Sequence, residues 1–277
     1  MQAWLDAGGD LIQLKMYQML GEVTPLVDTS GRCLVFHTGA IGQFTGGPGL
    51  LAEAESILRK LGCREAVGPL DGSTFFNYRC TLRGGEPLPL EPAASPEVWR
   101  SAGYREDARY VSVFEPNGER VCRARTPPPG WCLRNVDPAR FDDELRAMYR
   151  VSLSAFESAW RYQPISFELF RLLYEPFRGR FDPRWVWAVD DPAGVMQGYF
   201  FNFVAGDVVI AKTLALHRDA HGKGISWPMV AAMHQRARDA GLRGCVHHLM
   251  HESAVSTVFG SKESKVIRRY ALYRKAL

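Results

Sequence analysis

The sequence predicts an α/β protein with a mixed sheet, divided into two units. Three observations support this prediction. A strand, a helix and a strand follow one another within the first seventy residues, three runs of strand-forming residues lie between 185 and 216, and a proline-rich segment near residue 127 separates the two regions. A strand–helix–strand unit is a crossover connection, whereas short turns join antiparallel strands, so both strand directions are expected.

The N-terminal half contains one strongly periodic helix. Residues 49–61 repeat apolar side chains at spacings of three and four, and Gly62 stands at the expected C-terminal cap. Around this helix we expect a short helix before a turn at Pro25, a strand from Cys33 to about His37 that leads into a glycine-rich loop, a short apolar strand with a turn at 69–72, and a strand over 110–114.

The triple proline at 127–129 is the predicted boundary, giving units at 1–126 and 131–277. Asp137 is a candidate cap for the first helix of the second unit. We expect, in order, a strand at 131–136, helices at about 138–158 and 166–177, three antiparallel strands in RWVWAV, GVMQGYFFNFV and DVVIAKTLAL, a helix that ends at Gly241, a strand over GCVHHLM, a short helical stretch at 253–259, and a final strand pair over KVIRRYALYRK.

Composition excludes several functional classes. Hydrophobic residues make up 46% of the chain, charged residues 23%, and the net charge of +4 is not gathered into a basic block, so neither disorder nor nucleic-acid binding is expected. No apolar run reaches membrane-spanning length, and the N-terminus lacks the order of a signal peptide. The six cysteines form no C-x-x-C pair. We expect a cytoplasmic protein with reduced thiols.

The most informative local feature is the run HGKGIS, residues 221–226, between a predicted strand and a predicted helix. A helix N-terminus offers unpaired N–H groups and the positive end of its dipole, and glycines let an anion approach the backbone. Lys223 adds positive charge. The structural alternative is a tight turn that needs glycine only for its dihedral angles.

In this context the chain resembles the GNAT (GCN5-related N-acetyltransferase) superfamily. HGKGIS stands where RGKGIG is typical of the family, and the preceding TLALH is similar to the family's cofactor-binding strand. The resemblance covers residues 131–277 in element order. It departs from the family pattern at His221, where Arg or Gln is usual, and at Ser226, where a glycine or small apolar residue is usual.

The resemblance implies a GNAT fold that uses acetyl-CoA as co-substrate. By position, the backbone of Leu214, Ala215 and Leu216 would pair with the pantetheine arm, and the pyrophosphate would be held by His221, Gly222, Lys223, Gly224, Ile225 and Ser226. The two departures imply that this loop binds pyrophosphate more weakly than is usual in the family. Pyrophosphate should still bind, because backbone amides supply most of the hydrogen bonds to it.

The N-terminal half has a weaker likeness to the same superfamily. GPLDGSTFFNYR resembles a segment of large bacterial GNAT-like proteins, which implies a second, degenerate GNAT-like unit with a mainly structural role. Its glycine-rich loop lacks the basic residue and the spacing of the C-terminal loop. A polar and aromatic cluster after its turn is the predicted substrate-binding set, with a purely structural role as the alternative: Asp71, Ser73, Thr74, Asn77 and Tyr78.

Acetyl transfer to an amine requires a proton acceptor for the amine and a proton donor for the departing thiolate. Glu252 follows a predicted strand near the expected cofactor arm, and Lys212 lies within the strand before the loop. Tyr270 and Tyr273 are the candidate acids, because residues 253–259, where the resemblance places the acid, contain no tyrosine. Each of these four residues has an alternative interpretation as an ordinary surface or strand residue.

Three histidines, His247, His248 and His251, suggest a metal site at first sight. Consecutive strand residues point to opposite faces, so His247 and His248 do not converge on one ion, and no metal is predicted.

The expected function is transfer of an acetyl group from acetyl-CoA to a primary amine of a small molecule or peptide, without a covalent enzyme intermediate. Two alternatives stay open: an acyl-CoA-binding or sensing protein without catalysis, and an aminoacyl-tRNA-dependent transferase, which would need a basic face for RNA. No membrane or nucleic-acid partner is expected, and the oligomeric state is not predicted.

Overall fold

The computed structural model describes residues 2–84, 88–89, 94–254 and 262–277. The chain forms two compact units. Unit 1 consists of Met1–Tyr110, Trp160–Gln163 and Arg268–Leu277, and unit 2 of Val111–Ala159 and Pro164–Ile267. This division differs from one at the triple proline, because the boundary runs through a strand and the C-terminal residues return to unit 1.

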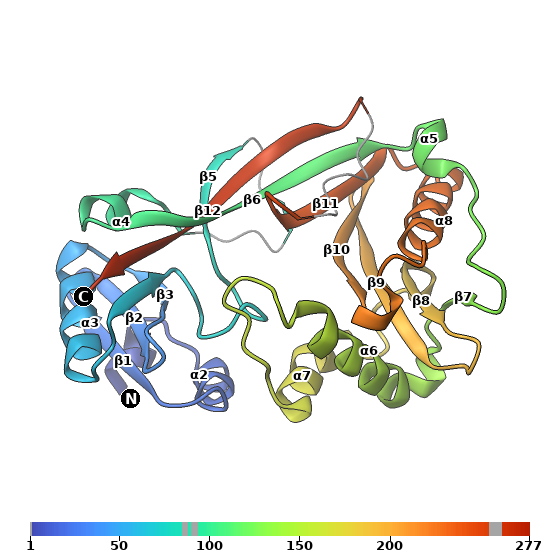
Figure 1. Ribbon diagram of the computed structural model, residues 1–277. Helices are drawn as coiled ribbons and strands as arrows, with labels where there is room; N and C mark the ends of the chain where they lie inside the picture. The colour runs from blue at the N-terminus through green and yellow to red at the C-terminus, as the bar shows by residue number, and fades with distance from the viewer. Residues whose placement is uncertain (1, 85–87, 90–93, 255–261) are drawn as a thin grey trace. The chain divides into compact units, whose positions relative to one another are not determined.

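Unit 1 contains a three-stranded antiparallel sheet in the order β1-β2-β3, and the C-terminal strand β12, which pairs with β4 and β5 (Figure 1). The helix α3 packs on the small sheet, and buried Leu50, Leu51, Ala54 and Leu58 form its apolar face. The elements are α1 Gln2–Asp6, α2 Leu11–Gln18, β1 Val23–Asp28, β2 Gly31–Phe36, β3 Ile41–Thr45, α3 Pro48–Lys60, β4 Glu65–Gly68, β5 Cys80–Gly84, α4 Glu97–Ser101 and the first part of β6 Arg105–Pro116.

Two expectations for unit 1 were wrong in detail. Pro25 does not form a turn: it lies within β1, which among the described strands pairs with β2 alone. An edge strand tolerates proline because the missing N–H is not needed on its open side. The predicted glycine-rich loop contains the strand β3, which pairs with β2. The turn at Gly39 closes this hairpin with a positive φ of 98°.

Unit 2 contains a mixed sheet in the order β6-β11-β10-β9-β8-β7. Each of the strands β7 to β10 is antiparallel to the next. Strands β10 and β11 are parallel, and the chain crosses from one to the other through helix α8. The elements are α5 Glu119–Cys122, β7 Cys132–Asn135, η1 Pro138–Arg140, α6 Phe141–Phe156, α7 Phe167–Tyr174, η2 Glu175–Phe177, η3 Pro183–Trp185, β8 Val186–Asp190, β9 Met196–Ala205, β10 Val208–Leu216, η4 Arg218–Ala220, α8 Ser226–Asp239, β11 Gly244–His251 and the start of β12 Lys265–Ala276.

Helices cover both faces of this sheet, α8 on one and α6 on the other (Figure 1). The alternation of strand side chains explains this arrangement. Trp187 and Phe200 join the apolar cluster with Met229 and Met233 of α8, whereas the neighbouring Tyr199 hydrogen-bonds through its hydroxyl to Ser152 of α6 at 2.7 Å. The predicted mixed α/β fold is confirmed.

The C-terminal segment differs from its prediction. Instead of a strand pair, Lys265–Ala276 forms one long strand, β12. The segment contains no Gly, Pro, Asn or Asp at which a turn could form. The helical stretch predicted at 253–259 falls mostly on residues 255–261, which lie outside the described residues.

Candidate cofactor-binding site

The site begins where β10 separates from β11. The two strands pair only from Val208 to Ala211, opposite Gly244 to His247, whereas β10 stays paired with β9 as far as Leu216. A register shift between Ala211 and Thr213 makes Lys212 the extra residue of a β-bulge. The three residues predicted to pair with the pantetheine arm therefore lie on a stretch whose second edge has no strand partner among the described residues.

The predicted phosphate-binding loop connects η4 to α8. Gly222 and Gly224 adopt φ angles of 75° and 74°, a region that costs other L-residues about 1–2 kcal/mol. No atom lies within 4 Å of a Cβ built at either glycine. Their surroundings therefore do not require glycine for packing, and open space faces the backbone on this side.

The loop and the start of α8 present backbone donors without acceptors. Ile225 is the N-cap of α8 and provides no side-chain cap. Within the described part of the chain, nothing accepts the backbone N–H of Gly222, Gly224, Ile225 or Ser226. Backbone donors without acceptors at the positive end of a helix dipole are suited to a phosphate or other anion, and the phosphate-binding role of this loop stays a prediction.

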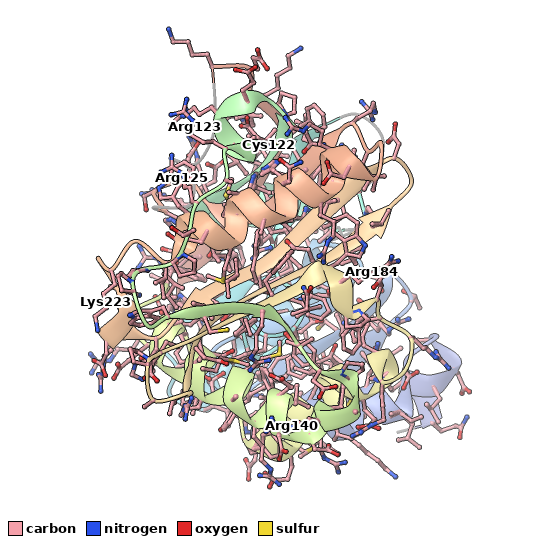
Figure 2. The ribbon with its side chains drawn as sticks, turned by 90° about the vertical axis from the view of Figure 1, so that its right-hand side faces the viewer. Cys122, Arg123, Arg125, Arg140, Arg184 and Lys223 are labelled. Atoms are coloured by element: carbon pink, nitrogen blue, oxygen red, sulfur yellow. The ribbon has the colours of Figure 1, made fainter. Side chains whose placement is uncertain are left out.

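Basic and aromatic side chains flank this loop, as Figure 2 shows for the exposed Arg125 and Lys223. The Lys223 ammonium lies 5.4 Å from the ring centroid of Trp131, and the Arg125 guanidinium lies 4.7 Å from that of Trp227. Both cations thus keep their charge at the surface beside the helix N-terminus, where it favours an anion.

The two departures from the family pattern have clear positions. His221 is exposed, and its Nε2 lies 3.2 Å from the carbonyl oxygen of Leu216, so the ring folds back on the end of β10. Ser226 is the first residue of α8 and is half-buried. At neither position does the side chain obstruct the glycine backbone, and both residues stay predicted members of the site.

Two predicted catalytic residues lie at the same end of the unit 2 sheet. Lys212 is exposed at the bulge of β10, and Glu252 is exposed in the turn that follows β11. Since β10 and β11 are parallel neighbours, their C-terminal ends lie at one edge of the sheet, which is also where the loop begins. Their catalytic roles stay predictions.

The two predicted tyrosines lie elsewhere, in the part of β12 that belongs to unit 1. Both rings are fully buried. Tyr273 is part of the apolar cluster around Trp99 and Leu58, and burial raises the pKa of its hydroxyl to about 12. Such an environment stabilises the core of unit 1, so the structure lends no specific support to tyrosine as the acid.

Asp71, of the predicted substrate-binding set, is buried in unit 1 with its carboxylate already engaged. It accepts hydrogen bonds from the Gln43 backbone N–H at 2.7 Å and the Tyr17 hydroxyl at 3.0 Å, and from the Gln43 side-chain amide. Burial raises the pKa of Asp71, although these donors oppose the shift. The observed contacts are those of a residue that fixes the loop.

The other members of the set surround that loop with different exposures. Ser73 is buried and its hydroxyl accepts from the backbone N–H of Phe75 at 3.3 Å, Thr74 and Tyr78 are half-buried, and Asn77 is exposed. The loop is closed by the backbone bond from Asp71 N–H to the Asn77 carbonyl. Only Thr74, Asn77 and Tyr78 thus present accessible side chains to a ligand.

Sequence reasoning missed Arg79, the residue after this set. Its buried guanidinium lies 3.4 Å from the Tyr78 ring centroid and 4.2 Å from that of Tyr110. Burial lowers the pKa of Arg79 to about 9. The two aromatic neighbours were visible in the sequence, but a single arginine beside a tyrosine gives no signal that it will be buried.

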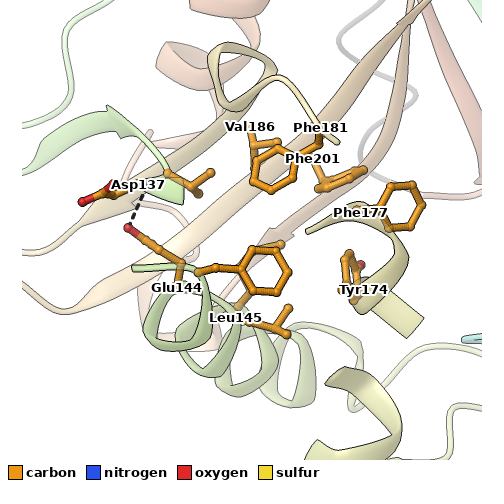
Figure 3. Close-up of a pocket in the computed structure, with 11 residues that line it drawn as sticks. Asp137, Glu144, Leu145, Tyr174, Phe177, Phe181, Val186 and Phe201 are labelled. Carbon is orange, nitrogen blue, oxygen red and sulfur yellow. Dashed lines mark hydrogen bonds between the residues drawn. The ribbon is translucent and has the colours of Figure 1, made fainter. Parts of the chain in front are cut away.

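A hollow lined by aromatic side chains lies in unit 2, between α6, α7 and the strands β8 and β9 (Figure 3). Tyr174, Phe177, Phe181 and Phe201 line it, and Glu144 lies at its polar end. That carboxylate accepts the backbone N–H of Asp137. No predicted site residue lines this hollow.

Comparisons with known proteins agree with the fold. No protein-family model matches this sequence, and no curated protein matches it significantly. The chain is similar in structure to a GCN5-related N-acetyltransferase from Sphaerobacter thermophilus, with 16% identity and a TM-score of 0.55 over 88% of this chain and 75% of that one. It is similar to a tandem GNAT protein from the clavulanic acid biosynthesis pathway, with 13% identity and a TM-score of 0.53 over 88% and 78%.

A third similar structure is a probable N-acyltransferase of unknown function from Enterococcus faecalis V583, with 14% identity and a TM-score of 0.56 over 92% of this chain and 58% of that one. At such identities the likeness concerns the fold alone. The chain therefore has the fold of the GNAT acyl-CoA N-acyltransferases, as its sequence predicted.

No described helix combines the length and the apolar composition that a membrane span requires.

Proposed function

We propose that this protein is an N-acetyltransferase that moves the acetyl group of acetyl-CoA to a primary amine of a small molecule or peptide. The observation that carries the proposal is that no described residue accepts the backbone N–H groups of Gly222, Gly224, Ile225 and Ser226. These donors lie at the N-terminus of a helix in a GNAT fold. A pyrophosphate supplies the acceptors that these donors lack.

The residues fit the rest of the cofactor as well. The β10 stretch from Leu214 to Leu216 offers an unpaired strand edge to the two amides of a pantetheine arm, in the way that one strand adds to another. Lys223 and Arg125 supply positive charge at the phosphate end. Acetyl-CoA would contribute a thioester carbonyl that an amine can attack directly.

In the proposed reaction, this chain's residues position the amine and move its proton. Glu252 is the proposed proton acceptor, because an exposed carboxylate after β11 can take the proton from an ammonium group at the open edge of β10. Lys212, at the bulge, is the proposed group that stabilises negative charge on the carbonyl oxygen or returns a proton to the thiolate. Separately, Thr74, Asn77 and Tyr78 of unit 1 stay proposed acceptor-binding residues, because their side chains are accessible.

A second candidate is an acyl-CoA-binding protein without turnover. The burial of Tyr270 and Tyr273 favours it, because neither hydroxyl is exposed to serve as an acid. The two candidates share the cofactor site and differ only in whether an amine consumes the thioester.

Calorimetry with acetyl-CoA on the full chain tests the shared site. A Gly222→Leu, Gly224→Leu double variant should bind at least about 100-fold more weakly. The leucine side chains would occupy the open space beside the loop and keep the pyrophosphate away from two backbone donors. Losing two charge-assisted hydrogen bonds costs about 3 kcal/mol or more. A Gly194→Leu, Gly206→Leu double variant is the matched control, since both glycines also have positive φ angles, of 76° and 60°, and open surroundings in turns of unit 2.

Each outcome distinguishes the proposals. Micromolar binding by the wild type and the control, but not by the loop variant, supports the cofactor site, and thiol release with a panel of amines then supports catalysis. Binding without turnover on any amine supports the second candidate. Absence of wild-type binding, or equal binding by both double variants, contradicts the cofactor site.

A further inference from the structure

Three metal-ligating side chains meet in the interior of unit 2. His234 lies on the sheet-facing side of α8, and Cys245 and His247 lie two residues apart on β11, hence on the same face of the strand. One ring nitrogen of each imidazole and the Cys245 Sγ lie within 4.8 Å of one another. The exposed fractions are 0% for His234 and Cys245 and 7% for His247.

The hydrogen bonds of Asn117 determine which nitrogen of His234 carries the proton. The Asn117 side-chain N–H₂ donates to the Leu242 carbonyl at 2.8 Å, which directs its Oδ1 to His234 Nδ1 at 2.9 Å. Since Oδ1 accepts, Nδ1 carries the proton and Nε2 carries the lone pair. An outer hydrogen bond of this kind orients a metal-ligating histidine.

The opposite nitrogens lack partners. Within the described chain, neither His234 Nε2 nor His247 Nε2 has a hydrogen-bond partner, although both are buried. A buried polar atom without a partner costs about 1–3 kcal/mol. The two imidazoles that carry these atoms both lie beside the Cys245 thiol, and a bound cation would give the unpaired nitrogens a partner.

We propose that His234, Cys245 and His247 bind a divalent zinc ion that links α8 to β11. Two imidazole nitrogens and one sulfur suit zinc rather than magnesium or calcium, which prefer oxygen ligands. The thiol loses its proton to solvent when the Zn–S bond forms, and the two imidazoles bind as neutral ligands. A water molecule completes a tetrahedral shell.

The geometry requires only a small adjustment. With Zn–N of about 2.0–2.1 Å and Zn–S of about 2.3 Å, tetrahedral ligand atoms lie about 3.4–3.6 Å apart. The three ligand atoms now lie within 4.8 Å of one another, so each pair has to approach by at most little more than 1 Å, which side-chain rotation allows. The sequence of β11 alone does not predict this site, because the third ligand, His234, comes from α8. His248 does point elsewhere, with its Nδ1 3.0 Å from the Ser112 hydroxyl.

Metal analysis and cobalt spectroscopy of the full chain, expressed without a polyhistidine tag, test this proposal. We expect the purified protein to hold about one zinc per chain. After removal by a chelator, cobalt(II) should produce tetrahedral visible bands and a near-ultraviolet thiolate-to-cobalt band. The Cys245→Ala variant should lose the thiolate band, and Asn117→Ala should weaken zinc affinity about 10–100-fold.

The matched control is Cys33→Ala, which removes an equally buried thiol from unit 1 and should leave metal binding unchanged. Circular dichroism verifies that each variant is folded. If wild-type protein takes up neither zinc nor cobalt, or if folded Cys245→Ala keeps the thiolate band, the site does not exist. None of these metal measurements requires acetyl-CoA to bind, so they test the zinc site independently of the proposed function.

Discussion

Arg134 of β7 joins two acidic side chains from different elements of unit 2. Its guanidinium binds Glu144 of α6 at 2.6 and 3.2 Å and Asp190 of β8 at 2.6 and 3.3 Å. The exposed side-chain fractions are 32% for Arg134, 8% for Glu144 and 13% for Asp190. Replacing Arg134 by methionine keeps much of the apolar stem but leaves two largely buried carboxylates without their cation.

The cost follows from this burial. Removing one partner of a buried ion pair typically costs about 3–5 kcal/mol, and partial exposure of Arg134 places the expectation near about 3 kcal/mol. At about 2–4 °C per kcal/mol for a domain of this size, the melting temperature should fall by roughly 6–12 °C.

Urea unfolding at pH 7, followed by circular dichroism, measures the loss of stability in Arg134→Met. Arg184→Met is the control, because the Arg184 side chain is 76% exposed and its ion pair with Asp182 should contribute less than about 0.5 kcal/mol. A loss below about 1 kcal/mol for Arg134→Met at pH 7 would refute this reasoning.

Two further predictions concern unit 1. Burial raises the pKa of Asp71, so the stability contributed by its neutral form is complete below the unfolded value of about 3.9 and is lost as the pH rises through the folded value. The stability advantage of wild type over Asp71→Asn should therefore be greatest near pH 4 and decrease toward pH 8 in urea titrations, and an advantage that increases with pH contradicts this assignment. Gly42→Ala should destabilise by about 1–3 kcal/mol, because its Cβ would lie 2.6 Å from the Leu70 carbonyl oxygen and 2.7 Å from the Asp71 Cα. Gly49→Ala, in the first turn of α3 with open surroundings, should instead stabilise the protein by about 0.5 kcal/mol. Thermal melts in which Gly42→Ala is more stable than Gly49→Ala would contradict the close packing around Gly42.

Local patterns in the sequence predicted the elements on which the candidate cofactor site is built. The glycines at 222 and 224 require special dihedral angles, and the helix behind them starts within a few residues, so one short segment contains the whole signal. The same holds for α3 and for the three strands β8, β9 and β10, whose periodicities and turns are local.

Elements that depend on a distant partner were predicted less well. Strand β12 is a single strand because β4 and β5, which lie far earlier in the chain, pair along it. Proline at 127–129 marks a break in secondary structure, whereas the division into units depends on which strands pack together. Such pairing energies arise between segments far apart in the chain.

The sequence by itself determined the fold class, the order of most elements and the position of the glycine loop before α8, because hydrophobic period and glycine placement act within a few residues. Only the tertiary structure decided which polar groups meet. Asp71 is held by Tyr17 across 54 positions, and Asn117 orients His234 across 117. Burial and hydrogen bonding of these groups depend on packing between distant segments, and no local pattern encodes it.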